Sequence, residues 1–146
     1  MRLLIFVLVL FLAAPVFAQD LLTVNDSLLT LFYDLWKDSG FGHNPYHVER
    51  AAWIYLEESG EYGQLRWPQS EEPNKEFWIG PIPRLAIAQA HTHPVVTDPR
   101  PSSHDVDVCK RLAIPLYTIS GSGIWVVTPD GKMVQILPSN WWTKYR

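Results

Sequence analysis

The chain has 146 residues, a formal net charge of -3, and 47% hydrophobic and 13% aromatic residues, a composition that favours a packed globular fold and excludes a disordered chain. Because the sequence contains no basic run, we expect no nucleic-acid partner. The single cysteine, Cys109, excludes an intrachain disulfide.

The first residues have the pattern of an export signal. A positive charge at Arg2 is followed by an apolar run over residues 3–16, and the small residue Ala18 precedes the expected cleavage point. The run is shorter than the ~20 apolar residues of a membrane-spanning helix, so we expect no membrane anchor after cleavage. The sequence therefore predicts a signal peptide at residues 1–18 and a single secreted or periplasmic domain at residues 19–146.

The segment from Asn25 to Gly40 is expected to form the first helix. Apolar residues recur there at the spacing of one buried helical stripe: Leu28, Leu31, Phe32, Leu35 and Trp36. Asp26 is expected to cap the start of this helix and Gly40 its end. A single stripe predicts a helix that covers one face of a sheet.

A strand pair and a long loop are expected next. The β-branched and aromatic residues from Trp53 to Leu56 favour a strand, and residues 64–67 are expected to return along it after a polar turn. Residues 68–83 are polar and contain several prolines, with no regular pattern. A loop of this length in a compact domain is usually functional or mobile, so we expect it to border an active site.

Two histidines follow a short apolar segment. Residues 84–90 are expected to form a buried strand that ends at Pro94, because proline cannot donate a hydrogen bond to a sheet ladder. His91 and His93 would then lie at the tip of the strand. Since side chains two residues apart in a strand share a face, the two imidazoles are expected to lie side by side.

A carboxylate is expected close to these histidines. Ser102 is the expected N-cap of a second helix, which places Asp105 within one turn of it. Two imidazoles and a carboxylate at an open-ended site are the ligand set of a catalytic zinc. A structural interpretation stays open, because Ser-x-x-Asp is also a helix-capping pattern and histidine pairs occur by chance.

The remaining segments predict the rest of a sheet. Residues 116–120, 124–128 and 133–137 are strand-like, and Asp130 and Gly131 are typical of a hairpin turn between the last two. Cys109 lies in the expected second helix and is interpreted as a small buried hydrophobe. The expected fold class is α/β, with a mixed β-sheet flanked by helices.

These motifs carry a family resemblance. His-x-His-Pro at 91–94, followed by Pro-Ser-x-x-Asp at 101–105, resembles the signature of the JAMM (JAB/MPN-type) zinc metalloproteases, over roughly residues 49–129. The resemblance implies a cytidine-deaminase-like architecture, with a water molecule as the fourth zinc ligand and a serine that stabilises the tetrahedral intermediate. The residues that match the zinc ligands are His91, His93 and Asp105, and the matching serine is Ser102.

One spacing differs from the family pattern. The segment between His93 and Ser102 is one residue longer than usual for the family, which leaves Asp105 or Asp107 as the third ligand. Asp105 is the preferred candidate because it keeps the three-residue step from Ser102.

The resemblance also implies a catalytic glutamate on an early strand. A zinc hydrolase needs a base that takes a proton from the attacking water and passes it to the leaving amine. Glu49 is similar in placement, at the entrance of the first expected strand. The alternatives are three glutamates in the following turn: Glu57, Glu58 and Glu61.

The sequence therefore predicts an exported, Zn²⁺-dependent hydrolase that cleaves an amide bond in a peptide or protein substrate. Two alternatives stay open. One is a non-catalytic metal-binding or interaction module of the same fold, and the other is a cell-wall peptide hydrolase or toxin-like effector. The oligomeric state is not predicted.

Overall fold

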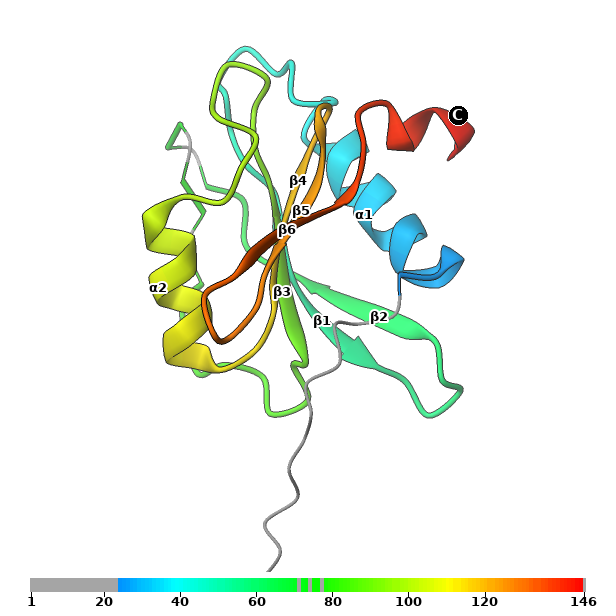
Figure 1. Cartoon of the computed structure of the whole chain (residues 1–146), viewed down its shortest axis with the longest axis vertical. Helices are drawn as coiled ribbons and strands as arrows, with labels where there is room; N and C mark the ends of the chain where they lie inside the picture. The colour runs from blue at the N-terminus through cyan, green and yellow to red at the C-terminus, as the bar shows by residue number, and fades with distance from the viewer. Residues whose placement is uncertain (1–23, 71, 74, 77, 146) are drawn as a thin grey trace, which may run out of the picture.

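The computed structural model describes residues 24–70, 72–73, 75–76 and 78–145 (Figure 1). The expected signal peptide at residues 1–18 lies outside the described residues. Within the described part of the chain, no helix has the length and apolar character needed to cross a membrane.

A six-stranded sheet forms the centre of the molecule, with the strand order β2-β1-β3-β4-β5-β6. The strands are β1 Ala51–Leu56, β2 Tyr62–Arg66, β3 Ala88–Thr92, β4 Leu116–Ser120, β5 Gly123–Val127 and β6 Met133–Leu137. β3 and β4 run parallel, whereas the other neighbouring strands pair antiparallel. Helices α1 and α2 lie on opposite sides of this sheet (Figure 1), which confirms the expected mixed sheet flanked by helices.

Helix α1, Asp26–Asp38, closes one face of the sheet. Phe32 is fully buried and contacts Tyr117 of β4 at a ring-centroid distance of 5.1 Å. The 3-10 helix η1, Trp141–Tyr145, packs against the same core through Trp141. This face is apolar and carries most of the buried hydrophobic side chains of the described residues.

The expected ends of α1 are partly corrected. Asn25, not Asp26, is the N-cap: its backbone is extended, and its Oδ1 accepts a 3.0 Å hydrogen bond from the N–H of Leu28. Asp26 already lies in the first turn, where its charge favours the helix dipole. Gly40 ends the helix as expected: its φ is +66°, and its N–H donates to the carbonyl of Lys37.

Strand β3 begins later than expected, at Ala88 instead of residue 84. Prolines at 81 and 83 precede a turn in which the N–H of Ala86 donates to the carbonyl of Pro83 at 2.9 Å, and this turn replaces the start of the strand. The strand instead continues through His91 and Thr92, which pair with Thr118 and Ile119 of β4.

Helix α2, Ser103–Leu112, covers only part of the other face. It packs against β4 and β5, where Cys109 is buried beside Leu116 and Val127, as expected for a small buried hydrophobe. The same face of β1 and β3 is not sealed in this way and borders a cavity. The incomplete cover by α2 is what leaves space for a site at the centre of the sheet.

Candidate metal centre

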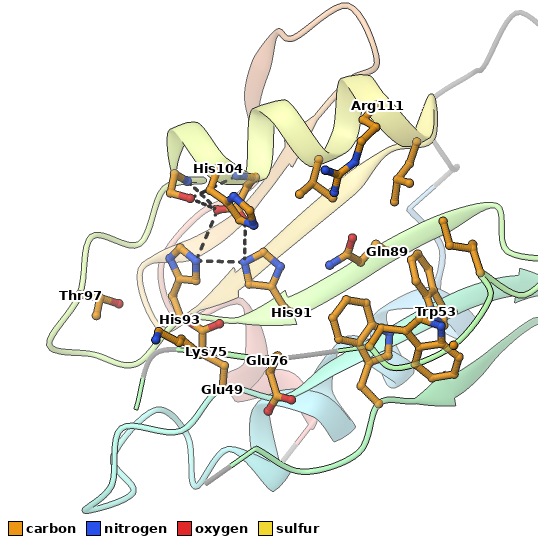
Figure 2. A pocket seen from close by; sticks show the side chains of 18 residues that line it. Glu49, Trp53, Lys75, Glu76, Gln89, His91, His93, Thr97, His104 and Arg111 are labelled. Carbon is orange, nitrogen blue, oxygen red and sulfur yellow. Dashed lines mark hydrogen bonds and ion pairs between the residues drawn. The ribbon is translucent and has the colours of Figure 1, made fainter. Parts of the chain in front are cut away.

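Three polar side chains converge at the end of β3 (Figure 2). The Nε2 atoms of His91 and His93 lie 3.0 Å apart. Asp105, from the first turn of α2, places Oδ1 3.6 Å from Nε2 of His91 and Oδ2 3.9 Å from Nε2 of His93. All three residues are buried, and their candidate ligand atoms lie within 4.8 Å of one another. The cluster could hold a metal ion.

The third member of the cluster is the residue that the three-residue step from Ser102 favours. Asp105 is 8% exposed and faces the histidines, whereas Asp107 is exposed and takes no part in the cluster. Successive residues of an α-helix are rotated by about 100°, so Asp105 and Asp107 point to nearly opposite sides of α2. The longer loop before Ser102 therefore does not change which acid points inward.

The surroundings of His93 fix which nitrogen carries its proton. Its Nδ1 lies 2.7 Å from the backbone carbonyl oxygen of Asp98. Because a carbonyl oxygen can only accept, Nδ1 must be the donor, and Nε2 of the neutral ring is left with a free lone pair directed at the cluster. A metal-binding histidine is commonly oriented by such a hydrogen bond from its other nitrogen.

His91 is a neutral imidazole at ordinary pH. Burial lowers its pKa to about 4, an effect that outweighs the opposing attraction of the Asp105 carboxylate, and the neighbouring His93 lowers the pKa further. A neutral imidazole can donate a lone pair to a metal ion, whereas a protonated one cannot.

Asp105 is held by a capping box with Ser102. Its Oδ2 accepts hydrogen bonds from the backbone N–H of Ser102 at 2.6 Å and from the Ser102 hydroxyl at 2.7 Å, while its own N–H donates to the Ser102 Oγ at 3.2 Å. Burial raises the pKa of Asp105, but the imidazole of His91 and the bonds from Ser102 outweigh it, and the net pKa is lowered.

The helix-capping interpretation of Ser-x-x-Asp is therefore confirmed, and it is compatible with a ligand role. Ser102 holds Oδ2, which leaves Oδ1 turned towards His91. The Ser102 hydroxyl proton points at Asp105 in this arrangement, so a hydrogen bond from this hydroxyl to a substrate requires its rotation.

The donor set fits a small divalent cation. Two imidazole lone pairs at 3.0 Å repel each other unless a proton or a cation lies between them. Ligands of a tetrahedral zinc, with bonds of about 2.0–2.2 Å, are separated by about 3.3 Å. The observed separations of 3.0, 3.6 and 3.9 Å bracket this value.

Glu49 lies in the same cavity, which has a volume of about 730 Å³ and also contains the cluster. Figure 2 shows it on the side of the histidines opposite α2. Burial, followed by the negative charges of Asp105 and Glu76, raises the pKa of Glu49 to about 8. The alternative glutamates of the β1–β2 turn, Glu57, Glu58 and Glu61, are exposed and do not line the cavity.

A second carboxylate in the cavity was not predicted. Glu76 comes from the irregular loop 68–83, its side chain is 4% exposed, and its Oε1 lies 3.7 Å from Nη1 of Arg50. Burial raises its pKa to about 7 against the opposing charge of Arg50. The loop lines the cavity that contains the cluster, and its role at an active site stays a prediction. No sequence period could indicate which of its residues turns inward.

Three further cavity residues were also missed, namely Trp53, Trp67 and Gln89. Gln89 could have been found, because it lies two residues before His91 on the same strand and therefore shares its face. The sequence pattern places Trp53 and Trp67 in strands without indicating which face they occupy. The pairing of the strands brings them to the cavity.

No protein-family model matches this chain, and no curated protein has a significantly similar sequence. The metal centre is therefore supported by the geometry of the described residues alone. That geometry consists of buried, convergent nitrogen and oxygen atoms that could bind a metal ion, in a cavity that Glu49 also lines.

Proposed function

We propose that the protein is an exported, zinc-dependent hydrolase of the JAMM type that cleaves an amide bond in a peptide or isopeptide. One observation carries the proposal: His91, His93 and Asp105 converge in an open cavity that also contains Glu49. A cytidine-deaminase-like architecture is part of the proposal, and the parallel pair β3–β4 joined through α2 supports it.

Zinc is the proposed metal because two imidazoles and one carboxylate form a typical three-residue set for catalytic zinc. His91, His93 and Asp105 would hold the ion. When bound, zinc supplies Lewis-acid polarisation and an activated water. The hydrogen bonds from His93 to the Asp98 carbonyl and from Ser102 to the Asp105 carboxylate would keep His93 and Asp105 oriented as ligands.

Glu49 is the proposed general base and acid. It accepts a proton as water adds to the substrate carbonyl, and it returns that proton to the nitrogen as the C–N bond breaks, so that amide and water become acid and amine. Its pKa of about 8 belongs to a carboxyl group that exchanges a proton near neutral pH, and a nearby cation would favour its ionised form.

Ser102 is the proposed donor to the developing oxyanion. It lines the cavity, and rotation of its hydroxyl moves the proton from Asp105 towards the substrate. A contact of this type contributes on the order of 3 kcal/mol to transition-state stabilisation.

A non-catalytic metal-binding module is the second candidate. The observation that favours it is the Ser102 hydroxyl, which is already bonded to Asp105 and needs no substrate. A cell-wall peptide hydrolase would use the same residues on a different amide, so it differs from the main proposal only in its substrate.

Metal analysis tests the centre. We expect about one equivalent of zinc in the purified wild-type protein and a loss of bound zinc in His93→Ala, which removes a lone pair fixed by the Asp98 carbonyl. His43→Ala is the matched control, because His43 is exposed and does not line the cavity. Equal zinc content in wild type and His93→Ala would contradict the proposal.

A hydrolysis assay tests the chemistry. Glu49→Gln should keep zinc but lose turnover by about 10²- to 10⁴-fold, because glutamine cannot carry the proton. New amines would be measured after incubation with purified cell-wall peptides and, separately, with folded proteins. Glu57→Gln is the control, as Glu57 is exposed in the β1–β2 turn. Full activity of Glu49→Gln would rule out its assignment as the base.

A further inference from the structure

The cavity continues beyond the metal cluster to a group of three tryptophans (Figure 2). Trp53 and Trp67 have ring centroids 5.1 Å apart, and Trp78 lies 5.9 Å from Trp53 and 6.0 Å from Trp67. They come from β1, from the residue after β2, and from the loop 68–83. We call these three residues the tryptophan wall.

Gln89 lies between the tryptophan wall and the metal cluster, as Figure 2 shows. It is 7% exposed and is the direct cross-strand partner of Trp53. Its Oε1 is buried and has no hydrogen-bond partner among the residues that the structure describes. A buried amide oxygen without a donor is destabilising, so this oxygen suits a ligand that donates a hydrogen bond to it.

The indole nitrogens add donors to this acceptor. The N–H groups of Trp53 and Trp67 are buried and have no acceptor within the described part of the chain. An acceptor and donors at one end of the cavity complement a peptide unit, which carries one N–H and one C=O.

The spacing from the cluster also suits a peptide. Gln89 and His91 are two residues apart on β3, so their Cα atoms are about 7 Å apart along the strand. This equals about two residues of an extended substrate chain. With the scissile amide at the cluster, Gln89 would lie beside the next peptide unit and the tryptophan wall beside a side chain one or two residues away.

The chemistry of the wall selects a neutral, apolar side chain. The negative charge of the Glu76 carboxylate is offset by Arg50, whose Nη1 lies 3.7 Å from its Oε1, so this carboxylate does not by itself select a cationic substrate group. Neither carboxylate oxygen accepts a hydrogen bond from the residues that the structure describes. The indole N–H of Trp78 donates to the Pro81 carbonyl at 3.0 Å. Ile82, Val108 and Leu112 extend the apolar lining. Aromatic rings in this tilted and edge-on arrangement suit another ring 4.5–7 Å away.

We propose that the tryptophan wall and Gln89 form a specificity subsite for a large apolar, preferably aromatic, side chain within two residues of the scissile amide. The assignment names the substrate class of the proposed hydrolase and therefore rests on that function. Gln89 holds the intervening peptide unit, and the wall holds the side chain.

A binding experiment without cleavage tests the subsite. Indole N–H signals of the purified protein would be followed by ¹⁵N NMR, with added zinc and separately in a chelator, during titration with N-acetyl-phenylalanine amide, N-acetyl-alanine amide and N-acetylglucosamine. We expect the phenylalanine probe to shift indole signals with a dissociation constant on the order of 1 mM, at least about ten-fold tighter than the alanine probe.

Variants locate the binding. Trp67→Leu should weaken the phenylalanine probe about five-fold, the loss of one aromatic contact, and Gln89→Leu should weaken it by a similar factor. Trp125→Leu is the matched control, because Trp125 is a half-buried sheet residue that does not line the cavity. If Trp67→Leu fails to fold, Trp78→Leu in the loop replaces it.

The outcomes are distinct. No shift with any probe, equal binding of the alanine probe, tighter binding of the sugar, or equal weakening by Trp125→Leu would each overturn the subsite. Binding of the phenylalanine probe by a protein that takes up no zinc would keep the subsite and overturn the proposed hydrolase. Zinc uptake and hydrolysis without preference for apolar residues would support the proposed hydrolase and overturn the subsite.

Discussion

The two faces of β3 show how one strand serves two purposes. One face of the strand points towards α1 and is fully buried; its residues are Ala88, Ala90 and Thr92. The Thr92 hydroxyl oxygen accepts a hydrogen bond from the backbone N–H of Arg50. Gln89 and His91 alternate with these residues and face the cavity, and His93 extends the same row. Both sets are buried, so burial alone does not separate a core residue from a site residue. The two faces differ in what packs against them. Helix α1 closes one face completely, whereas α2 covers only part of the other face and leaves the cavity.

We call the face packed against α1 the closed face and the face that borders the cavity the open face. Burial on the closed face stabilises the fold, whereas burial of ionisable groups on the open face is destabilising. On the open face, burial raises the pKa of Glu49 and Glu76 and lowers that of His91, so each group is held away from its preferred charge state. We therefore expect changes on the closed face to reduce stability without affecting metal binding, and some changes on the open face to increase stability while reducing function.

The largest effect on stability is expected for Phe32→Ala on the closed face. Removing a fully buried ring that contacts Tyr117 should lower the free energy of unfolding by about 3–5 kcal/mol. Denaturant unfolding would measure the loss, and metal analysis of the folded fraction should show zinc content equal to wild type. Loss of zinc from folded Phe32→Ala would contradict the expectation that changes on the closed face leave metal binding unaffected.

The next largest effect is an increase in stability, expected for Glu49→Gln on the open face. In the folded, metal-free protein the pKa of Glu49 is raised from 4.5 to about 8, so the folded state keeps a proton that the unfolded state releases. Stability from this group is therefore present below pH 4.5 and is lost as pH rises towards 8. Glu49→Gln cannot ionise and should be more stable than wild type by roughly 2–4 kcal/mol at pH 8, with little difference at pH 5.

Denaturant midpoints in a chelator, measured across this pH range, would check the expectation. Parallel curves for wild type and Glu49→Gln would show that Glu49 is not destabilised in the fold. Glu57→Gln serves as the control because Glu57 is exposed.

A smaller loss of stability is expected when either helix cap is removed, and the two caps can be compared directly because only one lies beside the cluster. Asn25→Ala on α1 and Ser102→Ala on α2 each remove a side-chain acceptor for a backbone N–H, so each should cost about 1 kcal/mol in unfolding free energy. Only Ser102 also holds the Asp105 carboxylate, so only Ser102→Ala should weaken zinc binding, by about 10- to 100-fold.

Competition with a chelating indicator would measure the zinc affinity of both cap variants. Ser102→Thr, which keeps the hydroxyl, should restore most of it. Equal affinities for Asn25→Ala and Ser102→Ala would mean that the capping box does not orient the ligand.

The smallest effect is expected for Asp107→Asn. Asp107 is exposed and outside the cluster, so zinc affinity should be unchanged and the free energy of unfolding should shift by less than about 0.5 kcal/mol. Asp105→Asn is its matched partner and should lose zinc, because the amide lacks the charge of the carboxylate. Loss of zinc from Asp107→Asn would reopen the choice between the two acids.

The local features of this protein could be predicted from its amino-acid sequence. Helical spacing predicted α1 and its buried stripe, and the hairpin turn at Asp130 and Gly131 predicted the pairing of β5 with β6. The alternation of strand side chains predicted that His91 and His93 share a face, and the step from Ser102 predicted the capped start of α2. Each of these follows from interactions between residues close in the chain.

Contacts between residues distant in the chain could not be predicted in this way, because they depend on how the whole chain folds. The pairing of β1 with β3 brings Trp53 opposite Gln89, and loop 68–83 brings in Glu76, a residue with no periodic signal. The first residue of β3, Ala88, pairs with Ile54 of β1, so the start of this strand also depends on a residue distant in the chain. The physical reason is that sheet register and loop packing depend on contacts across the whole fold, which no local pattern of side chains specifies.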